Sequence, residues 1–144
     1  MQNVERNASR QSTAYPTVQG HEWGIFDDSF ATDNAGRFTR VLAADCFWMP
    51  QVHAELVQSM LHFLSADGRV FLVSGFHTGR AKLAVFFDVA AEHGLEVEEI
   101  HEEDAEGVRR PWAKERDGGR ENPTERKRWL VLAVLKRAMT PPDE

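Results

Sequence analysis

Short apolar runs alternate along the chain with longer stretches in which apolar residues recur at helical spacing. Helical spacing occurs from Pro50 to about Gly68, and again from about Arg80 to His93. Four runs are typical of β-strands: 41–44, 69–74, 95–101 and 129–135. The first run ends at Asp45 and is expected to be buried on both faces. This alternation predicts an α/β fold with a mostly parallel sheet and helices packed on its faces.

The last two predicted strands have no helical pattern between them. Residues 102–128 form a strongly polar tract instead, so a long exposed loop is expected there. Its acidic run at 102–104 and its mixed run at 125–128 are interpreted as solvated, and we assign them no chemistry. Without a crossover helix, the final strand is free to join the sheet antiparallel.

The N-terminal region gives weaker signals. Residues 1–14 are mostly polar, with Val4 and Ala8 four positions apart, and are interpreted as a frayed helix. Residues 15–20 are interpreted as a short strand. Hydrophobic residues make up 42% of the 144, so the chain 1–144 is expected to be a single domain with its own core.

Composition narrows the classes of function. The formal net charge is −6 and the basic residues are interleaved with acids, which argues against binding nucleic acid through bulk electrostatics. The single cysteine, Cys46, cannot form an internal disulfide, and there is no CxxC pair. Neither a run of about 18 apolar residues nor a signal-peptide pattern occurs, so we expect no membrane contact and a cytoplasmic location.

Four motifs taken together resemble one enzyme family. They are Gly20-His21-Glu22-Trp23-Gly24, the segment from Leu42-Ala43-Ala44-Asp45 to Leu56, Val73-Ser74-Gly75-Phe76-His77, and Phe86-Phe87-Asp88-Val89-Ala90. With the helix-free final strands, this set resembles the class I, seven-stranded methyltransferases that use S-adenosylmethionine. Within them it is similar to the branch of nicotinamide N-methyltransferase-like and protein-lysine methyltransferases. The resemblance extends from about residue 18 to residue 136 and implies strands 3 to 7 of the family's Rossmann-like sheet.

The resemblance also implies a site and a reaction. Trp23 resembles the tryptophan that lies against the cofactor adenine, and Ala44, followed by Asp45, resembles the residue whose backbone lines the same pocket. The methyl acceptor is expected to be bordered by Phe47, Trp48, His53 and His77, at the end where open parallel sheets bind ligands. The implied reaction is transfer of the sulfonium methyl group to a nitrogen. That nitrogen would belong to a small amine or to a protein, such as a translation elongation factor.

The beginning of the family pattern is missing. The family starts with a strand and a Gly-rich turn that holds the polar end of the cofactor, and no such glycine cluster precedes Trp23. We therefore expect a truncated member with impaired cofactor binding. The exposed edge of strand 41–44 would then allow self-association. Two alternatives stay open: a non-catalytic protein-interaction module, and an incomplete gene product derived from the family.

The candidate residues also have structural interpretations. Trp23 by itself is more typical of a core anchor, and Asp45 could cap the helix that follows it. His53 and His62 share one face of a predicted helix, but no further ligands are spaced nearby, so no metal site is expected. Cys46 is interpreted as a buried, inert thiol rather than as a nucleophile.

Overall fold

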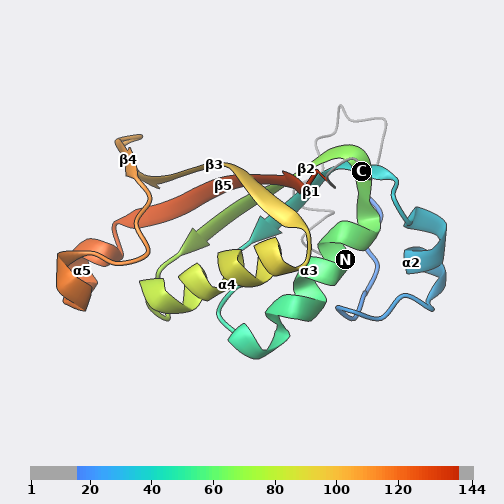
Figure 1. Ribbon diagram of the computed structural model, residues 1–144, viewed down its shortest axis with the longest axis horizontal. Helices are drawn as coiled ribbons and strands as arrows, with labels where there is room; N and C mark the ends of the chain where they lie inside the picture. Colours follow the sequence, from blue (N-terminus) through green and yellow to red (C-terminus); the bar gives the residue numbers. More distant parts are fainter. Residues whose placement is uncertain (1–15, 140–144) are drawn as a thin grey trace, which may run out of the picture.

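The computed structural model describes residues 16–139, which form one mixed sheet of five strands with helices beside it (Figure 1). The strands are β1 (Phe38–Ala44), β2 (Leu64–Gly75), β3 (Leu95–Asp104), β4 (Arg109–Pro111) and β5 (Trp129–Arg137). Their order across the sheet is β1-β2-β5-β3-β4. The predicted α/β class is confirmed, and the arrangement is compatible with a partial Rossmann-like fold. The sheet is not mostly parallel as expected, because β1 with β2 is the one parallel pair among the four pairs of neighbouring strands described. The helix predicted at 1–14 lies outside the described residues.

The last strand enters the middle of the sheet. β1 and β2 are parallel, whereas β5 lies between β2 and β3 and is antiparallel to both. The antiparallel final strand predicted from the helix-free connection is therefore confirmed. A parallel strand at this place would need a crossover over a sheet face, and the chain between β3 and β5 contains no helix long enough to make one.

Two helices cover one face of the sheet (Figure 1). They are α3 (His53–Phe63), which follows the 3₁₀ turn η1 (Pro50–Val52), and α4 (Arg80–Glu92). Pro50 occupies the first turn, where its missing N–H leaves no hydrogen bond unmade. Val57 of α3, Phe86 of α4 and Val131 of β5 are fully buried and belong to one continuous core.

Several boundaries differ from the predictions. The helix predicted to end near Gly68 ends at Phe63, because Leu64 already pairs with Phe38 as the first residue of β2. Residues 16–20 form no strand, and Tyr15 lies outside the described residues.

One short helix, α2 (Ser29–Asn34), was not expected. Its N-cap is Asp28, whose carboxylate accepts a 2.8 Å hydrogen bond from the Ala31 N–H.

The other face of the sheet is covered by no helix among residues 16–139 (Figure 1). Leu42 of β1 points to this side and is 79% exposed, while its neighbour Ala43 is buried under the helices. The expectation that strand 41–44 is buried on both faces is therefore wrong. An apolar run predicts a strand without indicating whether both of its faces find a partner.

The polar tract 102–128 is not a simple exposed loop. Glu102 and Asp104 belong to β3 and are buried, and the rest of the tract holds β4, the 3₁₀ turn η2 (Asp117–Gly119) and the short helix α5 (Pro123–Arg126). Burial is possible because arginines surround the two carboxylates, so their charges are compensated where they leave water. The prediction that the run 102–104 is solvated is wrong for these two residues.

Within residues 16–139, no helix is both long enough and apolar enough to cross a membrane.

Candidate functional site

A hollow of about 320 Å³ lies beside the free edge of β1, and we call it the edge hollow. It is enclosed by β1, α3 and the segment 21–23, and its lining is His21, Trp23, Val41, Leu42, Ala43, Ala44, Cys46, Leu56, Ser59, Met60 and Phe63. Trp23 and Ala44, which the resemblance assigned to one cofactor pocket, are thus brought together here. Asp45 is not part of this lining.

Hydrogen bonds to α3 hold Trp23 in place. The Gly24 N–H donates to Ser59 Oγ at 2.9 Å, and His21 Nε2 lies 3.0 Å from the same oxygen. Ser59 Oγ accepts from Gly24 and still has a proton to donate to His21 Nε2. In that tautomer of His21 the ring proton lies on Nδ1, which faces Asp28 Oδ2 at 3.4 Å. Sequence patterns did not indicate that His21 and Ser59 come together, since the two positions are 38 residues apart.

The turn at Gly24 requires a glycine. Its φ of +80° lies in the left-handed region, and a side chain there would come within 3.1 Å of Glu55. The close approach brings the Trp23 segment against α3, which forms the other wall of the edge hollow.

A second hollow, of about 130 Å³, lies at the carboxyl ends of β1 and β2, and we call it the strand-end hollow. It is lined by Asp45, Phe47, Trp48, Ser74, Gly75, His77, Thr78 and Leu83. Four residues that the resemblance placed around the cofactor and the acceptor therefore meet here: Asp45, Phe47, Trp48 and His77. The carboxyl end of a parallel pair is the place where open α/β sheets bind ligands.

Asp45 is the central polar group of the strand-end hollow. Its φ is +52°, in the left-handed region, and its largely exposed carboxylate accepts a 3.4 Å hydrogen bond from Ser74 Oγ. His77 Nε2 lies 3.8 Å from the other carboxylate oxygen. Met49, not Asp45, is the residue that precedes the helical turn at Pro50, so the capping interpretation of Asp45 is wrong.

Phe47 and His53 are core residues rather than accessible contacts. Phe47 is buried against Phe86, with ring centroids 4.6 Å apart, and forms the floor of the strand-end hollow. His53 is 0% exposed, its Nε2 bonds to the Phe47 carbonyl at 2.9 Å, and it lines neither hollow. The expectation that His53 borders an acceptor is therefore corrected, because the first turn of α3 faces the core.

The remaining candidates have local roles. Burial raises the pKa of the Cys46 thiol to about 11, with the Asp45 carboxylate adding to the rise, which agrees with an inert thiol. His62 Nε2 bonds to the Ala31 carbonyl at 2.8 Å, so His53 and His62 contact different backbone groups. In the described part of the chain, no three potential metal ligands come together.

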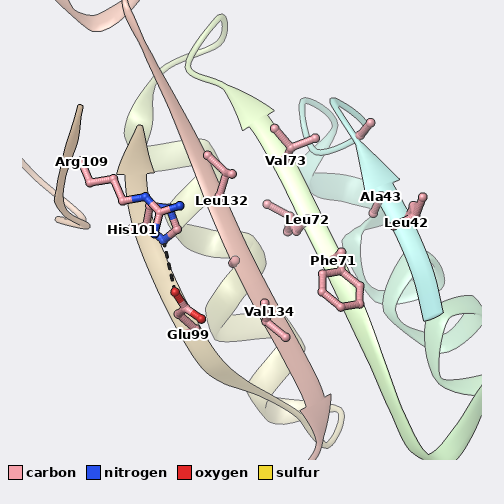
Figure 2. Close-up of a pocket in the computed structure, with 12 residues that line it drawn as sticks. Leu42, Ala43, Phe71, Leu72, Val73, Glu99, His101, Arg109, Leu132 and Val134 are labelled. Atoms are coloured by element: carbon pink, nitrogen blue, oxygen red, sulfur yellow. Dashed lines mark ion pairs between the residues drawn. The ribbon is translucent and has the colours of Figure 1, made fainter. Parts of the chain in front are cut away.

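A third hollow, of about 380 Å³, lies on the uncovered face of the sheet (Figure 2). Its walls come from β1, β2 and β5 and are apolar, and three polar side chains stand at its β3 and β4 side: Glu99, His101 and Arg109. Glu99 Oε1 and His101 Nδ1 are 3.7 Å apart. Sequence patterns did not indicate this hollow, because helices were expected on both faces of the sheet.

No protein-family model and no curated protein sequence matches the chain.

Proposed function

We propose that this chain is a class I methyltransferase-like protein of the N-methyltransferase type, in which binding of S-adenosylmethionine is impaired. The observation that carries the proposal is the meeting of Trp23 and Ala44 in one hollow directly beside the strand-end hollow of Asp45, Trp48 and His77. The insertion of an antiparallel final strand next to β2 also agrees with the resemblance.

The edge hollow suits the adenine half of S-adenosylmethionine. Trp23 supplies an aromatic face, and Leu56 and Met60 supply apolar surface around it. The lining contains no glycine and no Asp, Glu, Lys or Arg, so it offers no backbone cradle or charge for the amino-acid half. When bound, the cofactor supplies an electrophilic methyl group, and what this chain contributes is a place for its adenosine.

The strand-end hollow suits a cationic amine. Asp45 offers a carboxylate that is held by Ser74, and the half-exposed ring of Trp48 offers a face that attracts a cation. His77 faces Asp45 from the loop after β2, with Nε2 3.8 Å from the carboxylate, and adds a second polar side chain for a bound amine to contact. A small amine, or an amino group of a protein such as a translation elongation factor, has this chemistry.

Ligand-dependent thermal unfolding tests the proposal. Adenosine and S-adenosylhomocysteine at millimolar concentration should raise the melting temperature by the same amount, because the described residues hold only the part that the two ligands share. Trp23→Leu should weaken the binding of both ligands roughly 2- to 12-fold, because one aromatic contact contributes about 0.5–1.5 kcal/mol. Trp48→Leu is the matched control and should leave both shifts unchanged. An absence of any shift in the unmutated chain would refute the proposal.

A second candidate function is a non-catalytic interaction module. The uncovered apolar face of the sheet and the free edge of β1 favour it, since both are surfaces that proteins normally cover. A cooperative melt without a ligand shift, together with association that depends on concentration, would favour the module over the methyltransferase-like function.

A further inference from the structure

The uncovered face of the sheet carries an ordered apolar patch, which we call the open-face patch. The strand register places six apolar side chains in two rows across β1, β2 and β5: Leu42, Phe71 and Val134 in one row, and Ala44, Val73 and Leu132 in the other. The same side chains line the hollow of Figure 2. Leu130 of β5, which is 42% exposed, extends the patch by one position. A continuous apolar surface of this kind marks an interaction site.

Unlike charges stand at the two edges of the open-face patch. On β1, Arg40 lies two positions before Leu42, so it is on the same face of the sheet, and it is exposed. On β3, Glu99 is the register partner of Val134. The side chain of Glu99 is 64% exposed, and its carboxylate lies 3.7 Å from His101 Nδ1. The patch therefore has a cation at its β1 edge and an anion at its β3 edge.

These two edges match each other when one copy of the sheet faces another. A two-fold axis parallel to the strands, placed between two facing sheets, lays β1 over β3 of the second copy and β2 over β5. This rotation keeps each row over the same row, so Phe71 faces Val134 of the second copy. Arg40 then lies one row, about 7 Å, from Glu99 of the second copy, which is within the length of an arginine side chain. Facing sheets that bury such side chains pack about 10 Å apart.

The other two-fold axis for facing sheets runs across the strands, and the charges disfavour it. It lays each strand over the same strand of the second copy and reverses the order of the rows. Glu96 and Glu98, which lie beside Lys136, would then come over Glu103 of the second copy. Like charges brought together at an interface oppose association. Charge complementarity therefore selects the axis parallel to the strands.

The size of the face sets the strength expected for such a contact. Four strands, each about 5 Å wide, and four rows, each about 7 Å deep, make a face on the order of 500 Å². Specific interfaces of standard size bury about 800 Å² per partner, and smaller ones are typical of transient contacts. We therefore expect a dimer that exchanges with the monomer at micromolar concentrations.

We propose that the open-face patch is the interface of a symmetric dimer, in which the same patch of a second copy packs face to face against it. Phe71 and Val134 form the apolar centre of this interface, and Arg40 and Glu99 pair across it twice. The arrangement differs from pairing of two free β1 edges, which would leave the patch exposed and would not involve Glu99. The proposal does not rest on any methyltransferase-like function.

Charge exchange across the interface tests the proposal. Sedimentation velocity of the full chain, over micromolar to submillimolar concentrations, measures dimerisation, and the unmutated chain should dimerise. Arg40→Glu and Glu99→Arg should each weaken dimerisation at least about tenfold, because the two-fold axis makes like charges meet twice. An equimolar mixture of the two variants should dimerise about as strongly as the unmutated chain, since each contact then joins unlike charges again.

Lys82→Glu and Glu92→Arg are the matched controls. They make the same changes of charge at exposed positions of α4, on the helix side of the sheet, and should leave dimerisation unchanged. Circular dichroism checks that all four variants fold. An unmutated chain that stays monomeric, or a mixture that does not recover dimerisation, would overturn the proposal. Association that Glu99→Arg leaves unaffected would also overturn it and would assign the contact to the free edge of β1.

Discussion

The buried carboxylate of Glu102 makes contacts whose loss should be costly to the stability of the fold. Its side chain is 0% exposed and binds three arginines, with Arg80 Nη1 in close contact, Arg110 Nε at 2.7 Å and Arg116 Nη2 at 3.2 Å. Arg80 is itself buried and also bonds to Glu121 at 2.7 Å. Glu102→Gln keeps the size of the side chain and removes its charge, so Arg80 and Arg110 would be left with Glu121 as their carboxylate partner, and Arg116 with the Pro111 carbonyl.

The expected loss of stability is about 3 kcal/mol. Removing one partner of a buried ion pair costs roughly 3–5 kcal/mol, and the lower end applies because Arg110 and Arg116 are partly exposed and can recover water. Urea unfolding monitored by circular dichroism measures this loss. With a slope of about 1–3 kcal/mol per molar urea, the midpoint should fall by about 1–3 M.

Glu103→Gln is the matched control. It removes the same charge from the next residue of β3, but Glu103 faces the open side and binds the exposed Arg109, so water replaces the lost contact. The control should unfold close to the unmutated chain. Equal midpoints for the two variants would refute the reasoning, because they would mean that Glu102 is as well hydrated as Glu103.

The stability that the Glu102 carboxylate contributes should depend on pH. Burial alone would raise the pKa of Glu102, but the hydrogen bonds and charges of Arg80, Arg110 and Arg116 hold it below its ordinary value. A lowered pKa in the folded state stabilises the fold above the ordinary value of 4.5, and this contribution is lost as the pH falls through the folded pKa. The stability difference between the unmutated chain and Glu102→Gln should therefore be full at pH 7 and shrink below about pH 4.5.

Three further outcomes can be checked on the same protein. Phe86→Ala should cost about 3–5 kcal/mol in urea unfolding, because a fully buried ring is lost from between the helices and the sheet. Gly75→Ala would place a Cβ 2.8 Å from His77 Nε2, so it should displace that ring and shift its NMR signals while β2 stays intact. Cys46 should react with a maleimide at pH 8 at least about tenfold more slowly in the folded chain than in urea, because its pKa is raised to about 11.

Elements whose local signals and tertiary contacts agree could be predicted from the sequence. The helix expected from Arg80 to His93 is found at Arg80–Glu92, since its apolar face meets the sheet and Gly94, with a φ of +87°, ends it. The antiparallel last strand also followed from a local feature, the missing crossover helix.

The failures arise where distant residues decide the outcome. The acidic run at 102–104 has the sequence pattern of a solvated segment. Its burial depends on Arg80, which is 22 positions from Glu102 in the sequence and contacts it only in the folded chain. His53 has the same local pattern whether its turn faces a pocket or the core, and only packing against Phe86 decides between them. Trp23 and Ala44 were grouped by resemblance, whereas the bonds of Ser59 that position Trp23 join segments with no common sequence signal.

The central place of β5 in the sheet constrains when the fold can form. β1 and β2 are close in the sequence and can pair with each other soon after both have been synthesised. The second neighbour of β2 is β5, so Val70 can pair with Leu135 only after almost the whole chain has been made. Until then β2 and β3 are both open edges, and the core between them lacks Val131 and Ala133. Pairings so distant along the chain slow folding, and the waiting intermediate exposes strands that can pair with other chains. Premature termination anywhere before Trp129 would thus produce an aggregation-prone polypeptide rather than a smaller folded domain.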